Sequence, residues 1–200
     1  MLVEDEYKIE EEPSIDVKPV KKHSETWEWI QAIAIGIVLT VIVRTFFFTV
    51  VEVSGDSMLP TLHTGDRIFT TKIYKDLKYG DIIVFKPREN PSRPYIKRVI
   101  ATEGQTIDID YYTSEVKVDG EVLDEPFIKD QTIELKGNLQ LPAKVRIGTV
   151  FVMGDNRNNS HDSRATEVGL VDTKDIVGKA IFRLWPFGNP KYMSAEKKIK

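Results

Sequence analysis

One apolar segment near the start of the chain constrains the fold more than any other feature. Residues 29–43 carry no charged side chain, and apart from Arg44 the mainly apolar stretch continues to Val51. At a rise of about 1.5 Å per residue, a helix of this length crosses the roughly 30 Å hydrocarbon core of a bilayer. Its apolar residues are not confined to one stripe, as they are in a helix that packs on a soluble core. We therefore predict a transmembrane helix over residues 29–51.

The flanks of this segment favour an uncleaved anchor. Trp27 and Trp29 at one end and the aromatic residues 46–48 at the other resemble interfacial anchors. Arg44 lies close enough to the far end for its long side chain to reach the headgroups. A cleaved signal peptide is the alternative, but the bulky residues 45–48 offer no small-residue cleavage site and the leader before the segment is long. No later segment is apolar and long enough to span, so a single crossing is expected.

Charge sets the expected topology and excludes several classes of function. The formal net charge is −3, and residues 1–22 hold all of it, so no basic field for nucleic-acid binding is expected. This acidic leader, residues 1–28, is predicted to be disordered; its lysines 18, 21 and 22 place it in the cytoplasm by the positive-inside rule. The chain has no cysteine and only three histidines, and this scarcity of metal-ligating side chains argues against a metal site. Residues 191–200 are predicted to be a basic, solvated tail.

The chain beyond residue 52 is predicted to be mainly β, with an extracytoplasmic domain over residues 52–190. Short runs of β-branched and aromatic residues alternate with turn residues, a spacing typical of antiparallel sheets. The predicted strands are 67–71, 81–85, 95–102, 106–110, 116–118, 121–123, 145–153 and 176–184. Asp119 and Gly120 separate two of them and predict a two-residue type I′ hairpin.

Ser57 is the first candidate for chemistry, because it follows Gly55 in a sharp turn just after the apolar segment. Pro60 stiffens the chain that follows. The same pattern also occurs in ordinary turns without any function.

Lys97 is the second candidate. Strand alternation sends Lys97 and Arg98 to opposite faces of one predicted strand, so at least one of these cations faces a packed interior. A lysine with a pKa near 10.4 is no base at neutral pH, but burial lowers such a pKa to about 7 or 8. The alternative is a solvent-facing lysine on an edge strand.

Residues 154–164 form the third unusual stretch, a dense polar loop after an apolar strand. Either it is a solvated loop with local turns, or its Asp and Arg side chains build a hydrogen-bonded floor under a site. His161 and Asp162 next to a serine suggest a Ser-His-Asp triad, but neighbours in sequence rarely converge on one point. We do not expect that triad.

Taken in order, the motifs resemble those of a bacterial type I signal peptidase. After the anchor come residues 57–62 (SMLPTL), 79–85 (YGDIIVF), 95–100 (YIKRVI) and 154–164 (GDNRNNSHDSR). The resemblance covers roughly residues 27–190, and the single anchor is similar to the Gram-positive form of the family. The lysine at position 97 resembles the bacterial enzymes rather than the endoplasmic-reticulum form, which has a histidine.

The resemblance implies an antiparallel β-domain of the kind shared with SOS-response repressors, carrying a serine endopeptidase that needs neither metal nor cofactor. Ser57 would be the nucleophile and Lys97 its general base. Ser160 would orient Lys97 by a hydrogen bond. Supporting ion pairs would come from Arg98, Asp155, Asp162 and Arg164. The vicinity of the oxyanion hole and the substrate would comprise Gly55, Asp56 and Met58; some members of the family carry a serine where this chain has Gly55.

The implied substrates are secretory preproteins, cleaved after Ala-x-Ala and bound as an extended strand along an exposed sheet edge. The lipid bilayer would be the other partner, and residues 185–187 either contact lipid or belong to the core or to a chain-terminating turn. Two alternatives remain at this point. One is a non-catalytic, membrane-anchored β module that binds peptides; the other is a self-cleaving Ser-Lys regulator, which needs a DNA-binding domain where this chain has its anchor.

Overall fold

The computed structural model describes residues 25–132, 139–187 and 198–199. It divides into two compact units, with the boundary between residues 39 and 40. The helix α1 spans Glu25–Phe46, has no buried residue, and is long and apolar enough to cross a membrane. The predictions made for residues 1–24 and for most of the C-terminal tail lie outside the described residues.

The helix ends earlier than the sequence predicts. Residues 47–51 were expected to complete the span, but Phe48–Glu52 form the strand β1, which pairs antiparallel with β2, Arg67–Thr71. Aromatic and β-branched residues pack well on a pleated surface, and the Phe48 ring stacks on Phe69 of β2 with centroids 4.9 Å apart. Cross-strand packing therefore overrides the apolar character of this stretch. The helix also begins earlier than predicted, at Glu25.

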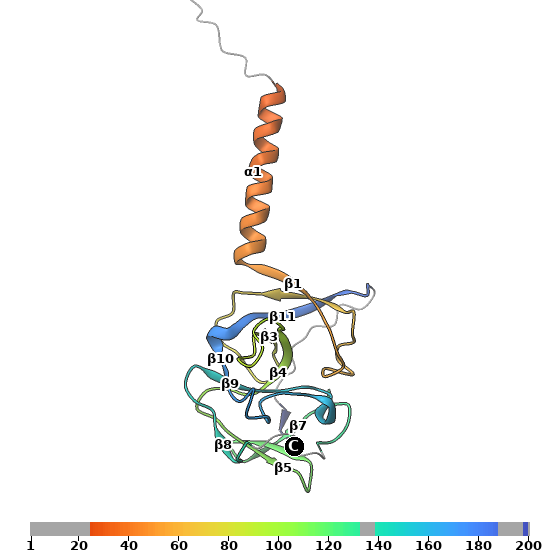
Figure 1. The fold of residues 1–200 in the computed structure, drawn as a ribbon, viewed down its shortest axis with the longest axis vertical. Coiled ribbons are helices and arrows are strands. Elements are labelled where there is room, and N and C mark those ends of the chain that lie inside the picture. Colours follow the sequence, from red (N-terminus) through yellow and green to blue (C-terminus); the bar gives the residue numbers. More distant parts are fainter. Residues whose placement is uncertain (1–24, 133–138, 188–197, 200) are drawn as a thin grey trace, which may run out of the picture. The chain divides into compact units, whose positions relative to one another are not determined.

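Two antiparallel sheets make up the rest of the described chain. The first has seven strands in the order β1-β2-β11-β3-β4-β9-β10, and the second has five in the order β12-β7-β6-β5-β8. The strands β5, β7 and β8 of the second sheet lie together on one side of the domain (Figure 1). The remaining elements are β3 (Ile82–Phe85), β4 (Tyr95–Ala101), β5 (Thr106–Asp110), β6 (Glu115–Val118), β7 (Glu121–Asp124), β8 (Ala143–Lys144), β9 (Thr149–Met153), β10 (Val171–Asp172), β11 (Ile176–Trp185), β12 (Lys198–Ile199) and the 3₁₀ turns η1 (Arg157–Asn159) and η2 (Thr173–Asp175). The predicted mainly β class is confirmed.

All eight predicted strands are present; 67–71 and 106–110 have the predicted ends, and the other six have shifted ends. The largest difference is at residues 145–148, which were predicted to belong to β9 but form a turn. Gly148 has a φ of 72°, and the Thr149 N–H donates to the Arg146 carbonyl, a turn bond that is incompatible with a continuous strand. The predicted hairpin is confirmed: Asp119 and Gly120 have φ of 56° and 84°, as a type I′ turn requires.

The strand β4 lies inside the larger sheet, paired with β3 on one side and β9 on the other. Its neighbour β3 is buried on both faces: Ile82 and Val84 belong to one hydrophobic cluster, Ile83 and Phe85 to another. Lys97 and Arg98 on β4 are consequently only 4% and 3% exposed. The alternative of a solvent-facing lysine on an edge strand is therefore wrong, because both edges of β4 are paired and both faces are covered.

A separate hydrophobic cluster joins the two sheets. Ile107 of β5 and Val118 of β6 pack there with Phe151 and Met153 of β9, all essentially without solvent exposure. Because burial of aliphatic surface is the main favourable term in folding, this cluster fixes the smaller sheet against β9, which leads into the polar loop at 154–164.

We expect Ile107→Ala to lower the free energy of unfolding by about 2–5 kcal/mol, through lost burial and the cavity left behind. Ile147→Ala is the control, since Ile147 is 89% exposed and its truncation leaves no cavity. Chemical denaturation of the detergent-solubilised chain measures both. Equal stabilities for the two variants would contradict this account of the core.

Candidate active site

Ser57 lies in a loop that closes on itself between β1 and β2. The Val53 N–H donates to the Asp66 carbonyl (2.8 Å), and the Gly65 N–H donates back to Val53 (2.9 Å). Gly55 has a φ of 92°, a conformation that strongly favours glycine, and its N–H donates to Thr64 Oγ1 at 3.1 Å. Met58, next to the serine, is buried in the core. The Ser57 side chain therefore starts from a firmly held backbone.

The side chain of Lys97, which lies on β4, contacts Ser57. Its Nζ lies 2.8 Å from Ser57 Oγ and 3.1 Å from the Ile96 carbonyl oxygen, to which it donates. The Tyr95 ring covers the same amine, with 5.2 Å between Nζ and the ring centroid. The two candidates that the sequence identifies separately, forty residues apart, are thus in direct contact.

Burial lowers the pKa of Lys97 from its ordinary value to about 8. The carboxylates of Asp162 and Asp155 act in the opposite direction and raise it, while the Arg164 guanidinium lowers it further. Removing an ammonium from water disfavours its charged form. A useful fraction of Lys97 is consequently neutral, and able to accept a proton, near neutral pH.

Both side chains open into a cleft of about 470 Å³. Its walls come from residues 51–58 and 93–97, with Asn159 and His161 at one side. The predicted residues Gly55, Asp56 and Met58 all line it. Among the described residues, the Ser57 backbone N–H has no hydrogen-bond partner, so it remains available beside the serine hydroxyl.

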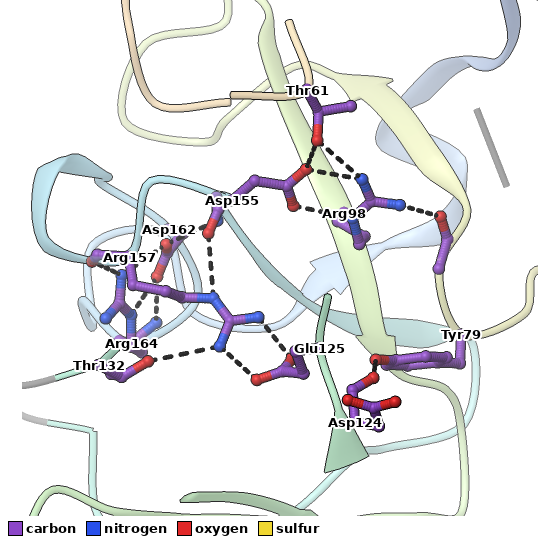
Figure 2. A network of polar contacts seen from close by, with 12 residues as sticks. Thr61, Tyr79, Arg98, Asp124, Glu125, Thr132, Asp155, Arg157, Asp162 and Arg164 are labelled. Atoms are coloured by element: carbon purple, nitrogen blue, oxygen red, sulfur yellow. Dashed lines mark hydrogen bonds and ion pairs between the residues drawn. The ribbon is translucent and has the colours of Figure 1, made fainter. Parts of the chain in front are cut away.

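A buried ion pair lies next to Lys97. Arg98 forks onto Asp155, with Nε to Oδ1 at 2.8 Å and Nη2 to Oδ2 at 2.6 Å, and Thr61 Oγ1 donates to the same carboxylate at 2.5 Å (Figure 2). Parallel bonds of this kind are strong and directional. They fix Asp155, the residue that follows Gly154 at the start of the polar loop.

A second pair braces the far end of that loop. Arg164 donates from Nε and Nη2 to the two oxygens of Asp162, at 2.8 and 2.9 Å, and the Gly154 N–H also donates to Asp162. Burial by itself raises the pKa of Asp162, but the bonds from Arg164 and Gly154 outweigh it and hold that pKa below its usual value. The loop is thus a buried, charge-paired floor rather than a solvated turn.

Ser160 differs from what the resemblance implies. Its hydroxyl is buried without a hydrogen-bond partner, so the bond to Lys97 is not formed in this structure. The hydroxyl instead lies against Gly154, where an added Cβ would approach it to well under 3.0 Å. Its role in orienting Lys97 stays a prediction.

His161 takes no part in a triad. It lies half exposed with its Nε2 3.7 Å from Glu89 Oε1, whereas the neighbouring Asp162 is buried and bonded to Arg164. Two further buried groups escape sequence reasoning: Thr61, and the pair of Arg157 with Glu125. The only signal for Arg157 was its place in the polar loop, and nothing in the sequence indicates its partner.

Comparison with known proteins shows the family of this chain. The family described as "Signal peptidase, peptidase S26" matches residues 26–185. The chain belongs to this family. It is 36% identical over 180 residues to a signal peptidase I of Bacillus licheniformis, covering 85% of this chain and 94% of the relative. It is 40% identical over 171 residues to signal peptidase I P of Bacillus subtilis subsp. natto, covering 80% and 90%. A solved signal peptidase I from Enterococcus faecalis V583 matches with 26% identity and a TM-score of 0.44, covering 53% of this chain and 97% of the other.

As a member of the signal peptidase I family, the chain is a serine endopeptidase that removes signal peptides from secreted preproteins. This sets aside the non-catalytic peptide-binding module and the self-cleaving regulator. The apolar helix α1 fits a membrane-anchored enzyme.

Gly154→Ala tests how tightly the loop closes on the serine. An added Cβ would come within 3.0 Å of both Ser160 Oγ and the Ser57 carbonyl oxygen, and displacing that carbonyl moves the serine itself. We expect kcat/KM for signal-peptide cleavage to fall at least about 100-fold, as small misplacements of reacting groups do. In Gly36→Ala, where the added Cβ meets nothing within 4 Å, activity should be unchanged. A fully active Gly154→Ala enzyme would refute this close packing.

Proposed function

We propose that Ser57 and Lys97 form the catalytic dyad with which this signal peptidase cleaves secretory precursors after an Ala-x-Ala sequence. The observation that carries the proposal is the contact of 2.8 Å between Lys97 Nζ and Ser57 Oγ, made by an amine whose pKa burial lowers to about 8. A serine hydroxyl is a weak nucleophile until a neighbouring base accepts its proton. Lys97 is the group that lies in position to do so.

The reaction follows from these two groups. Ser57 Oγ attacks the scissile carbonyl while its proton passes to neutral Lys97, giving a tetrahedral intermediate and an ammonium. The ammonium returns a proton to the leaving amine as the C–N bond breaks, leaving an acyl ester on Ser57. Lys97, again neutral, then deprotonates a water that attacks the ester carbonyl. As the ester C–O bond breaks, the Lys97 ammonium returns this proton to Ser57 Oγ, which releases the carboxylic acid product and restores both groups. No metal or cofactor is required in this scheme.

The negatively charged oxygen of the tetrahedral intermediate needs a hydrogen-bond donor to stabilise it. The Ser57 N–H, unpartnered among the described residues, is suited to this task, since preorganised backbone donors stabilise such an oxyanion. Gly55 offers no hydroxyl, so the hole depends on backbone N–H groups or water. Asp56 supports this geometry through its carbonyl, which accepts a bond from Asn156 Nδ2 at 3.0 Å.

The neighbouring polar groups act by positioning. Arg98 with Asp155, and Arg164 with Asp162, hold the floor beneath Lys97. Lys97 Nζ makes two hydrogen bonds to protein groups and has a third hydrogen to give once it is protonated. Ser160 Oγ, which lacks a partner, is the acceptor we assign to it.

Specificity for small residues fits the cleft. Its apolar lining comes from Val51, Val53, Met58 and Ile96 beside the serine, which suits alanine side chains of an extended peptide. The strand β1 borders the cleft at Val51 and Glu52, and β2 is the only described strand that pairs with it. Its other edge is therefore suited to the addition of a substrate strand.

Membrane anchoring completes the proposal. We assign residues 1–28 to the cytoplasm, α1 to the bilayer of the bacterial cell membrane, and residues 52–190 to the outer side, followed by a basic tail. A precursor held by its own apolar signal segment then meets the enzyme in the same thin layer, which raises the effective concentration. Trp185 and Phe187 are exposed aromatic residues, and such side chains are suited to the lipid interface.

Ser57→Ala and Lys97→Met should each lower the rate of precursor cleavage by at least about 10³-fold, because the nucleophile and its base act as a unit. The assay uses the detergent-solubilised full chain and a precursor with an Ala-x-Ala site, with the product ends identified by mass spectrometry. Ser92→Ala and Lys86→Met, at exposed positions, are the matched controls. Undiminished cleavage by either dyad variant would exclude the dyad; efficient cleavage after a leucine in place of the second alanine would exclude the specificity.

The pH profile tests the role of the lysine. Because the base must be neutral and burial lowers the pKa of Lys97 to about 8, kcat/KM should rise about tenfold per pH unit well below pH 8 and level off above it. Rates measured between pH 5.5 and 10 with buffers of constant ionic strength give the midpoint. A maximum below pH 6 would contradict a lysine base.

A further inference from the structure

The segment between β7 and the end of the first described range, residues 125–132, contacts the polar loop at several points. Arg157 donates from Nη1 and Nη2 to the two carboxylate oxygens of Glu125, at 2.7 and 2.5 Å, and Nη1 also reaches Thr132 Oγ1 at 3.4 Å (Figure 2). Arg157 is fully buried, and the Glu125 side chain is only 7% exposed. This fork is only slightly less enclosed than the two ion pairs nearer the dyad.

Other contacts tie the same segment to the loop and to its ion pair. The Lys129 N–H donates to the Asp155 carbonyl at 3.0 Å, and Asn158 Nδ2 donates to the Gln131 carbonyl at 2.9 Å. The Phe127 ring lies against the Arg98 guanidinium, with 3.9 Å between Arg98 Cζ and the ring centroid. The segment therefore holds both partners of the Arg98–Asp155 pair as well as Arg157.

Arg157 passes this restraint into the loop in two directions. Its Nε donates to the Gly154 carbonyl at 3.2 Å, and its own carbonyl accepts a bond from Arg164 Nη2 at 2.6 Å. Among the described residues, Glu125 is the only carboxylate that hydrogen-bonds to Arg157. Removing it would leave a buried guanidinium without its partner, a costly state from which the side chain is expected to move.

The loop in turn holds the backbone of the nucleophile. The Asn156 N–H donates to the Ser57 carbonyl at 3.0 Å, and Asn156 Nδ2 donates to the Asp56 carbonyl at 3.0 Å. Asn156 is the residue directly before Arg157. A displacement of Arg157 therefore acts on the serine through one intervening residue.

We propose that Glu125 is a positioning residue of the peptidase: through Arg157 and Asn156 it fixes the backbone at Ser57 so that the serine hydroxyl stays in contact with Lys97. This inference rests on the proposed dyad and extends it. Glu125 contacts neither the substrate cleft nor the reacting atoms, so it acts on the chemical step rather than on substrate binding.

Glu125→Gln tests the proposal, because it keeps the shape of the side chain and removes its charge. In the full chain in detergent, at a temperature where thermal unfolding shows the variant to be folded, we expect kcat to fall at least tenfold and KM to change less than threefold. Rates are normalised to the fraction of Ser57 that an acylating inhibitor labels. Glu125→Asp, which restores the carboxylate, should recover most of the loss. Glu115→Gln, which removes an exposed carboxylate paired with Lys117, should have no effect.

Wild-type kcat in folded Glu125→Gln would overturn the proposal, as would a loss that Glu125→Asp does not recover at all. If Glu125→Gln fails to fold, Arg157→Lys decides alone, because it keeps the positive charge but cannot form the two-pronged bond to Glu125: a lowered kcat with KM changed less than threefold supports positioning, and wild-type kinetics overturn it. Failure of the dyad itself is distinguishable, since Ser57→Ala would then remain active whatever position 125 carries.

Discussion

The burial of the Lys97 amine is the constraint on which the arrangement of the site depends. Lys97 can act as a base only if its charged form is disfavoured, and the protein achieves this by placing it on a strand whose edges and faces are all covered. The same placement brings Nζ to 2.8 Å from Ser57 Oγ. Burying a cationic residue costs stability, so the surrounding hydrophobic clusters have to be extensive enough to offset that cost.

In the proposed mechanism, a buried base next to a nucleophile also needs a polar floor that stays ordered. Three guanidinium–carboxylate forks supply it, formed by Arg98 with Asp155, Arg164 with Asp162, and Arg157 with Glu125. Buried pairs of this kind contribute little net stability, because desolvation offsets much of the attraction, yet each loses much when one partner is removed. Their value here is geometric: they leave the loop one low-energy arrangement, in which the Asn156 N–H bonds to the Ser57 carbonyl.

The local sequence pattern predicts those helices, strands and turns whose conformation depends mainly on residues nearby in the chain. The anchor helix, the eight strands and the hairpin at Asp119 and Gly120 follow from hydrophobic periodicity and turn chemistry. The residues of the dyad are identifiable as unusual, although only the fold brings them together. What escapes prediction depends on distant partners: β1 forms inside an apolar run because Phe69 lies opposite, and Glu125 becomes important only because Arg157 lies beside it, 32 residues away in the chain. The resemblance does not predict every contact, since the bond that it implies between Ser160 and Lys97 is not formed here.

The two sheets contribute differently to the site: one supplies residues that line the cleft, and the other supports the polar loop. The described residues that line the cleft come from the segments around β1 and β4 and from the polar loop, and none comes from β5, β6, β7 or β8. The smaller sheet nevertheless packs through Ile107 and Val118 on β9, which leads into the polar loop, and β7 leads directly into Glu125. A loop that connects elements on a protein surface is ordinarily mobile. Held from one side by the sheet that carries Lys97 and from the other by the segment after β7, this loop gains the rigidity that a precisely placed serine demands.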